Sequence, residues 1–113
     1  MKFSYKSFPI YTVITLEGQY IGGDETDQLS LFTRELINKD VINIIIDMEA
    51  TTYINSIMIG FLVKINNELL SKSGKLILCN VSKVIMEVFE ITKVSDLIQI
   101  CSDCEQAVDA ITS

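Results

Sequence analysis

The pattern of apolar and polar positions is clearest between residues 41 and 60. Residues 41–47, VINIIID, form a nearly continuous run of β-branched side chains, which is typical of a strand buried on both faces. Residues 48–54 are more polar and predict a loop, which leads to Asn55 and Ser56 at the start of a long amphipathic helix. A buried strand followed by a turn and a helix amino terminus is a common place for a functional site in α/β proteins.

Two patterns define the elements before this strand. Residues 2–7 and 10–17 alternate between apolar and polar side chains and predict two strands. Residues 18–23 contain three glycines and predict a loop. Asp24 is then predicted to cap a helix. That helix has an apolar stripe at helical spacing, formed by Leu29, Phe32, Leu36 and Ile37.

The helix predicted over residues 56–72 is the clearest helix in the chain, because apolar residues recur at helical spacing and Gly74 suits its carboxyl-terminal cap. The face expected to be buried consists of Ile57, Phe61, Ile65 and Leu69, flanked by Met58, Leu62 and Leu70. The face expected to be exposed consists of Lys64, Asn66, Asn67, Glu68 and Ser71.

The remaining residues continue the alternation of strands and helices. Residues 75–80 and 97–101 predict short strands, Ser82 caps a third helix, and a capping box from Ser102 to Glu105 opens a fourth. The third helix should bury Val84, Ile85, Val88 and Phe89. The predicted order is β-β-α-β-α-β-α-β-α, which favours an α/β fold with a mainly parallel sheet and an antiparallel first strand at its edge.

Composition narrows the function classes. The 113 residues are about the modal size of one domain, so a single domain over residues 1–113 is expected. The formal charge of −6, with no basic stripe, argues against binding nucleic acid or an anionic membrane surface. No apolar run approaches the ~20 residues that span a bilayer, and no signal peptide is visible. We therefore expect a cytoplasmic protein without direct membrane insertion.

The sequence contains little that would support an enzymatic function. The chain has no histidine, no glycine-rich phosphate loop and no Gly-x-Ser-x-Gly motif. Cys101 and Cys104 have the spacing of a redox pair, but a strand-end residue followed by a helix residue is the favoured interpretation. Three cysteines without histidine are too few for a structural zinc site. Neither an enzyme, a metal site nor a cofactor is expected.

The start of the second helix supports a binding surface. Asn55 and Ser56 could serve only as an ordinary amino-terminal cap. However, Ile57, Met58 and Ile59 are three consecutive large apolar residues, and they cannot all face the sheet. At least one should lie near the surface, where exposed apolar groups beside a loop favour contact with a partner.

The whole chain resembles the STAS domains, the family of the bacterial anti-sigma-factor antagonists. The resemblance covers residues 3–111 and is carried by the joint spacing of five stretches rather than by one motif. These are LEG at 16–18, IIID at 44–47, YINSIMIG at 53–60, GKLILCN at 74–80 and VFEIT at 88–92. It implies a singly wound, mainly parallel sheet of four to five strands, with about four helices mostly on one side.

The resemblance also implies a function without catalysis. Family members bind an anti-sigma factor that is also a serine kinase, and phosphorylation at the start of the second helix ends this binding. The family's motif there is Asp-Ser-Ser/Thr-Gly-Leu-Gly, with the third residue as acceptor. In this chain Asn55 replaces the Asp, Ser56 matches the first serine, and Ile57 occupies the acceptor position. Met58 replaces the glycine, and a second acidic position of the family falls on Ile21.

We therefore expect a protein-interaction domain that resembles an anti-sigma-factor antagonist and lacks the usual phosphoacceptor. The expected partner-binding residues are Ile21, Gly22, Asn55, Ser56, Ile57 and Met58, with Ser56 as the remaining candidate phosphoacceptor. Two alternatives stay open: a cytosolic STAS subunit of a lipid-transport ABC system, and a module that senses a small ligand near residues 18–23 and Asn55. The sequence also leaves open whether the chain forms a homodimer.

Overall fold

The computed structural model describes residues 2–112 and contains one five-stranded sheet. The strand order is β1-β2-β3-β4-β5; β1 is antiparallel to β2, and the other neighbours are parallel. The strands are β1 (Phe3–Ser7), β2 (Thr12–Tyr20), β3 (Asn43–Ile54), β4 (Lys75–Cys79) and β5 (Gln99–Cys101). The helices are α1 (Asp24–Asn38), α2 (Ser56–Ser71), α3 (Lys83–Ile91) and α4 (Cys104–Thr112), with a 3-10 turn at Val94–Asp96. The predicted fold class is confirmed.

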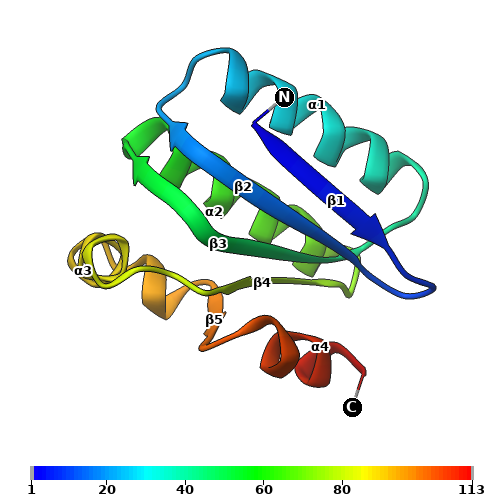
Figure 1. Cartoon of the computed structure of the whole chain (residues 1–113). Coiled ribbons are helices and arrows are strands. Elements are labelled where there is room, and N and C mark those ends of the chain that lie inside the picture. Colours follow the sequence, from blue (N-terminus) through cyan, green and yellow to red (C-terminus); the bar gives the residue numbers. More distant parts are fainter. Residues whose placement is uncertain (1, 113) are drawn as a thin grey trace.

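The helices cover the two faces of the sheet unequally. In Figure 1, α1 and α2 lie behind the sheet. Ile44 and Ile46 of β3 belong to the large core cluster that these helices and α3 complete. Ile45 points to the other face, where it joins Ala107 of α4 in a smaller cluster. All three isoleucines are fully buried, so the prediction of a central strand buried on both faces is confirmed.

Strands β2 and β3 extend farther than the sequence pattern predicts. The predicted loop at residues 48–54 is strand, and so is the first half of the predicted loop at 18–23, because the ends of β2 and β3 pair with each other up to Tyr20 and Ile54. Register shifts interrupt this pairing after Thr15 and Gly18. Such irregularities break the alternation of side chains between the two faces, which explains why the local pattern did not indicate a strand.

The predicted starts of two helices and one strand are also corrected. Asp24 is the first helical residue, and Gly23 occupies the cap position of α1 without a side-chain hydrogen bond. At the start of α4, the side chains that accept backbone hydrogen bonds are Asp103 and Gln106, not the predicted Ser102 and Glu105. Asp103 Oδ1 accepts from the Gln106 amide, and Gln106 Oε1 accepts from the Ser102 amide. The predicted strand over residues 97–101 begins only at Gln99, because Val94–Asp96 forms the 3-10 turn before it.

The end of α2 departs from the prediction that Gly74 is its cap. Lys72 is the C-cap, and Ser73 has the positive φ of 64°. Gly74 is needed for a different reason: a Cβ atom there would lie 2.0 Å from the Ile42 carbonyl oxygen. Its lack of a side chain allows the backbone to pass close to the start of β3.

The buried faces of two helices differ from the predicted ones. In α2, Ile57 and Leu70 are exposed, whereas Asn66 is buried and donates from Nδ2 to the Leu97 carbonyl. In α3, Val84 is 71% exposed, because the helix presents Ile85 and Phe89 to the core. Within residues 2–112, no helix is both long enough and apolar enough to cross a membrane.

Candidate partner-binding site

Asn55 joins the two chain segments in which the sequence predicted a site. As the N-cap of α2, its Oδ1 accepts from the amides of Ile57 at 3.1 Å and Met58 at 3.3 Å. Its Nδ2 donates to the Ile21 carbonyl at 2.9 Å. The cap is therefore Asn55 alone, and Ser56 is the exposed first residue of the helix. An aspartate could make the two capping bonds but has no donor for the Ile21 carbonyl.

Gly22 fixes how closely the loop after β2 approaches α2. A Cβ atom at Gly22 would lie 2.7 Å from Ile57 Cδ1 and 2.9 Å from Ile57 Cγ2, and its φ is +90°. The Gly22 amide donates to Thr26 Oγ1 at 3.0 Å, and Thr26 is buried near the start of α1. Glycine is thus required here both by the backbone conformation and by the space that Ile57 fills.

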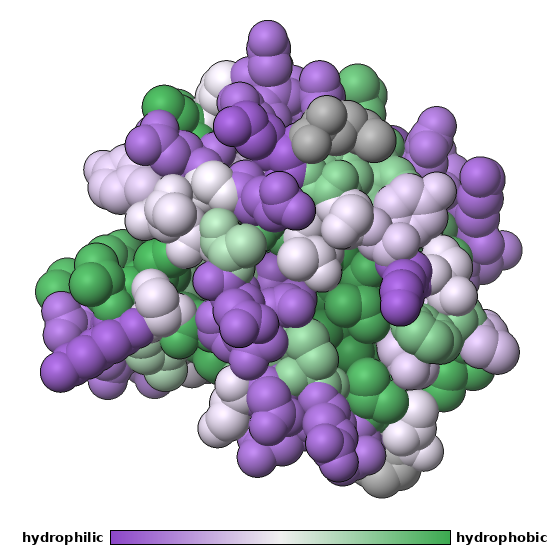
Figure 2. All heavy atoms as spheres, viewed as in Figure 1, coloured by the Kyte–Doolittle hydropathy of each residue, from purple (hydrophilic) through white to green (hydrophobic). Residues whose placement is uncertain are grey.

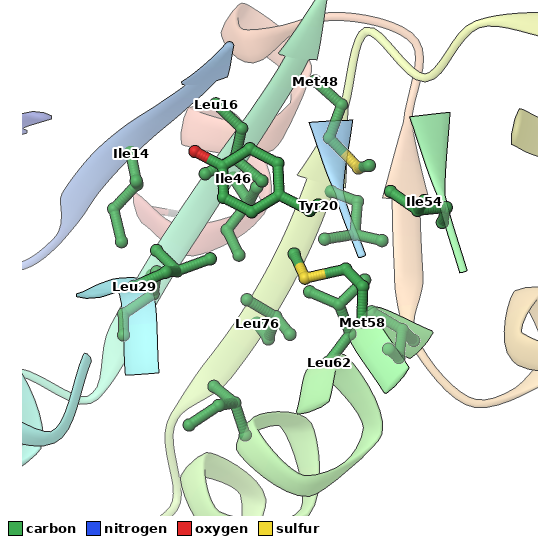
Figure 3. Close-up of a cluster of buried hydrophobic side chains, with 14 of the residues drawn as sticks. Ile14, Leu16, Tyr20, Leu29, Ile46, Met48, Ile54, Met58, Leu62 and Leu76 are labelled. Atoms are coloured by element: carbon green, nitrogen blue, oxygen red, sulfur yellow. The ribbon is translucent and has the colours of Figure 1, made fainter. Parts of the chain in front are cut away.

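The predicted site residues differ in exposure. Ile57 is 58% exposed and Ile21 is 44% exposed, and Ser56 is also exposed. Met58 is fully buried, so its predicted place on the binding surface is wrong. Figure 3 shows Met58 pointing from α2 into the cluster that contains Tyr20, Ile54 and Leu62. Ile57 and Met58 are consecutive residues of α2, and the rotation of about 100° per residue in an α-helix directs the first to the surface and the second to the core.

Tyr20, the last residue of β2, is buried directly before the loop that contains Ile21 and Gly22. The side chain is fully buried, and its hydroxyl donates to the Lys2 carbonyl. Burial raises the pKa of Tyr20 to about 12, with nearby acidic groups adding a smaller effect. The phenol is therefore neutral over the physiological range and acts as a structural hydrogen-bond donor next to Ile21.

The site provides a contact surface without general acid-base groups. Its exposed part consists of Ile21, Ser56 and Ile57, held over Gly22 and Asn55. None of these side chains titrates near neutral pH, and Ser56 has the only hydroxyl among them. Five hollows of about 150–360 Å³ lie elsewhere on the described surface, and none of these five is lined by residues 18–23 or Asn55.

A second cluster, at the carboxyl end of β4, brings together groups that the sequence analysis treated separately. Cys79 Sγ lies 2.6 Å from Cys104 Sγ, and Asp47 completes a group whose candidate ligand atoms all lie within 4.8 Å. Cys101 is in β5 and Cys104 begins α4, as the favoured interpretation of the Cys-x-x-Cys spacing expected. The contact between Cys79 and Cys104 was missed, although adjacent parallel strands do end at the same edge of a sheet.

Other exposed apolar residues lie on α3. Val84 and Ile91 are 71% and 80% exposed. Figure 2 shows hydrophobic atoms at the left of the molecule, where Figure 1 places α3. Val84 is the second residue of α3, as Ile57 is the second residue of α2, so it offers a matched comparison for the candidate site.

Comparison with solved structures gives closely similar folds at low identity. TM1081 of Thermotoga maritima, assigned as an anti-sigma factor antagonist, has a TM-score of 0.91 and 17% identity, covering 98% of this chain and 95% of that chain. The unphosphorylated anti-sigma factor antagonist SpoIIAA has a TM-score of 0.78 and 22% identity, covering 96% of both chains. A STAS domain protein of Planctomyces limnophilus has a TM-score of 0.83 and 20% identity, covering 98% of both.

The sequence itself provides the family assignment. No curated protein sequence matches the chain. The family model for the STAS domain, however, matches residues 6–107. This range includes all five strands except the first residues of β1, and it includes both segments of the candidate site. Its match along nearly the whole sheet, together with the shared fold, establishes that this chain belongs to the STAS domain family.

Proposed function

We propose that this STAS domain is a non-enzymatic, cytoplasmic protein-interaction domain of the anti-sigma-factor antagonist kind. Its partner is an anti-sigma factor of the serine-kinase type, and the contact surface is formed by Ile21, Ser56 and Ile57, positioned by Gly22 and Asn55. The observation that carries this proposal is the exposure of Ile57 at the start of α2, directly against the loop after β2.

The energetics of this surface favour contact with a partner. Ile57 lies against Gly22 on one side, and the residue is still 58% exposed to water. Covering exposed apolar area is worth about 25 cal/mol per Å². The Asn55–Ile21 hydrogen bond holds the two segments together, which reduces the conformational entropy lost on binding.

The same residues support the loss of the phosphorylation switch. SpoIIAA has been solved in phosphorylated and unphosphorylated forms. In this chain the position that matches the family's acceptor carries a hydrocarbon, and Ile21 and Asn55 replace the two nearby acids. Ile57 thus supplies a constitutive apolar contact where the phosphorylatable relatives carry a hydroxyl whose phosphorylation ends binding.

A charge placed at Ile57 tests the binding surface. Ile57→Asp should weaken binding to the cognate anti-sigma kinase by ~2 kcal/mol or more, as expected for a central interface residue. Folding should change little, because the side chain is exposed and an acid in the first turn of a helix is favourable. Binding is measured by titration calorimetry and folding by circular-dichroism melting.

Val84→Asp is the matched control, because it places the same charge at the second residue of another helix. It should leave the affinity unchanged. Equal affinity of wild type and Ile57→Asp would contradict the proposed surface. Selective binding of a transporter ATPase, with none of an anti-sigma kinase, would instead support the ABC-system alternative.

Intact-mass spectrometry tests the proposed loss of phosphorylation. After incubation with the cognate kinase and ATP, the wild-type chain should keep its mass. A gain of one phosphate that disappears in Ser56→Ala would show that Ser56 has taken over as acceptor. Ile57→Ser should not restore efficient phosphorylation, because Ile21 and Asn55 still lack carboxylates.

A further inference from the structure

All three cysteines of the chain lie near one another at the carboxyl ends of β4 and β5. Cys79 is the last residue of β4 and pairs in register with Cys101, the last residue of β5. Cys104 is the first residue of α4. The Sγ atoms of Cys79 and Cys104 are 2.6 Å apart, well inside the about 3.5–4.0 Å that is optimal for non-bonded heavy atoms.

Rigid elements hold this contact on both sides. Cys79 is fully buried and belongs to the cluster that contains Ile45 and Ala107, so α4 is packed directly against its strand. Cys104 is half-buried, which leaves it within reach of a small reagent. Burial raises the pKa of both thiols. The reduced pair is therefore neutral, since burial disfavours the thiolate form of each cysteine.

The polar neighbours favour a dithiol over a metal site. Asp47 Oδ1 already accepts hydrogen bonds from the Glu49 amide and from Asn80 Nδ2, each at 3.0 Å. Two thiolates on one zinc ion, each about 2.3 Å from the metal in tetrahedral geometry, would lie well over 3 Å from each other. The observed sulfur contact is shorter than that.

We propose that Cys79 and Cys104 form a reversible disulfide when the chain meets a low-molecular-weight organic disulfide, RS–SR. Cys104, the accessible thiol, loses its proton and attacks one sulfur of RS–SR, which releases RS⁻. Cys79 then gives up its proton and attacks Cys104 Sγ, which releases the second RS⁻. Each RS⁻ takes up one proton. Two protein thiols are thus oxidised to one disulfide, and RS–SR is reduced to two RSH.

The Cys79–Cys104 disulfide would connect α4, which packs on one face of the sheet, to strand β4. It closes a chain segment that spans 25 positions and includes α3, the 3-10 turn and β5. Such a cross-link restricts the unfolded chain. It fastens the first residue of α4 to β4 and is independent of the partner surface at Ile57.

Oxidation of the full chain in glutathione buffers tests the proposal. With oxidised glutathione in excess, the free thiols should fall from three to one, and peptide mapping should identify a Cys79–Cys104 link. The melting temperature should rise on the order of 10 °C, the range expected for closing a loop of this length. Reduced glutathione in excess should restore three alkylatable thiols and the original melting temperature.

Two variants separate this pair from the other possible pairs. Cys101→Ser should retain both the disulfide and the rise in melting temperature, whereas Cys104→Ser should lose both. Cys104 is only half-buried, so this change should leave the reduced fold intact. A link between Cys101 and Cys104, or between Cys79 and Cys101, would overturn the proposal. So would three free thiols under strongly oxidising buffer, or one zinc ion per chain that protects the thiols from alkylation.

Discussion

Gly22 and Ile57 show how one missing side chain shapes the candidate site. The φ of +90° at Gly22 is one that other residues rarely adopt, and Ile57 occupies the space of the absent Cβ. Gly22→Ala should therefore destabilise the fold by about 1–3 kcal/mol through backbone strain. It should also move Ile57 and weaken partner binding. Urea unfolding and a binding titration measure the two effects.

Gly60→Ala provides the control for this prediction. Gly60 lies within α2, and a Cβ atom there would have nothing within 4 Å. Alanine should stabilise the helix by roughly 0.5–1 kcal/mol. If Gly22→Ala were as well tolerated as Gly60→Ala, the close contact between Gly22 and Ile57 would not exist in solution.

Asn55 has two functions that substitutions can separate. Asn55→Ala removes the cap of α2 and should cost about 0.5–2 kcal/mol, whereas Asn55→Asp keeps a capping oxygen and should cost less. Both variants lose the donor to the Ile21 carbonyl, so both should speed amide hydrogen exchange in residues 21–23. Unchanged exchange in Asn55→Asp would mean that this bond does not hold the loop.

At the scale of elements, the junction between α2 and β4 depends on two neighbouring residues with different requirements. Ser73 adopts a φ of 64°, so Ser73→Gly should stabilise the protein by about 0.5–1 kcal/mol. Gly74→Ala should destabilise it by at least about 1–3 kcal/mol, because the new methyl group meets the Ile42 backbone. Midpoints of urea unfolding compare the two. If Ser73→Gly were destabilising and Gly74→Ala stabilising, these two backbone assignments would be contradicted.

At the scale of the whole molecule, the sheet separates two hydrophobic cores of different size, and β3 contributes side chains to both. Ile46 contributes to the core under α1, α2 and α3, and Ile45 to the core under α4. Both side chains are fully buried. Either one changed to alanine should cost ~2–5 kcal/mol from lost transfer energy and the remaining cavity. A loss below 0.5 kcal/mol for Ile45→Ala alone would show that α4 does not form a true second layer.

The sequence alone determined the order of elements, the parallel sheet and the family. These depend on repeated signals: the β-branched run at 41–47, the long amphipathic pattern at 56–72, and motifs spread over most of the chain. It also named Ile21, Gly22, Asn55 and Ile57 as candidates for a partner-binding surface, and the structure brings these four residues close together. Such information is local or follows from the order of the elements along the chain, so it survives without coordinates.

Only the tertiary structure decided which side chains of the site are available to a partner. Ile57 and Met58 are adjacent and both apolar, but α2 turns Met58 into the core and leaves Ile57 exposed. The residue that caps the helix, the extra length of β2 and β3, and the meeting of Cys79 with Cys104 were decided in the same way. Each depends on contacts between segments far apart in the sequence, and no local pattern records the relative rotation or register of two such segments.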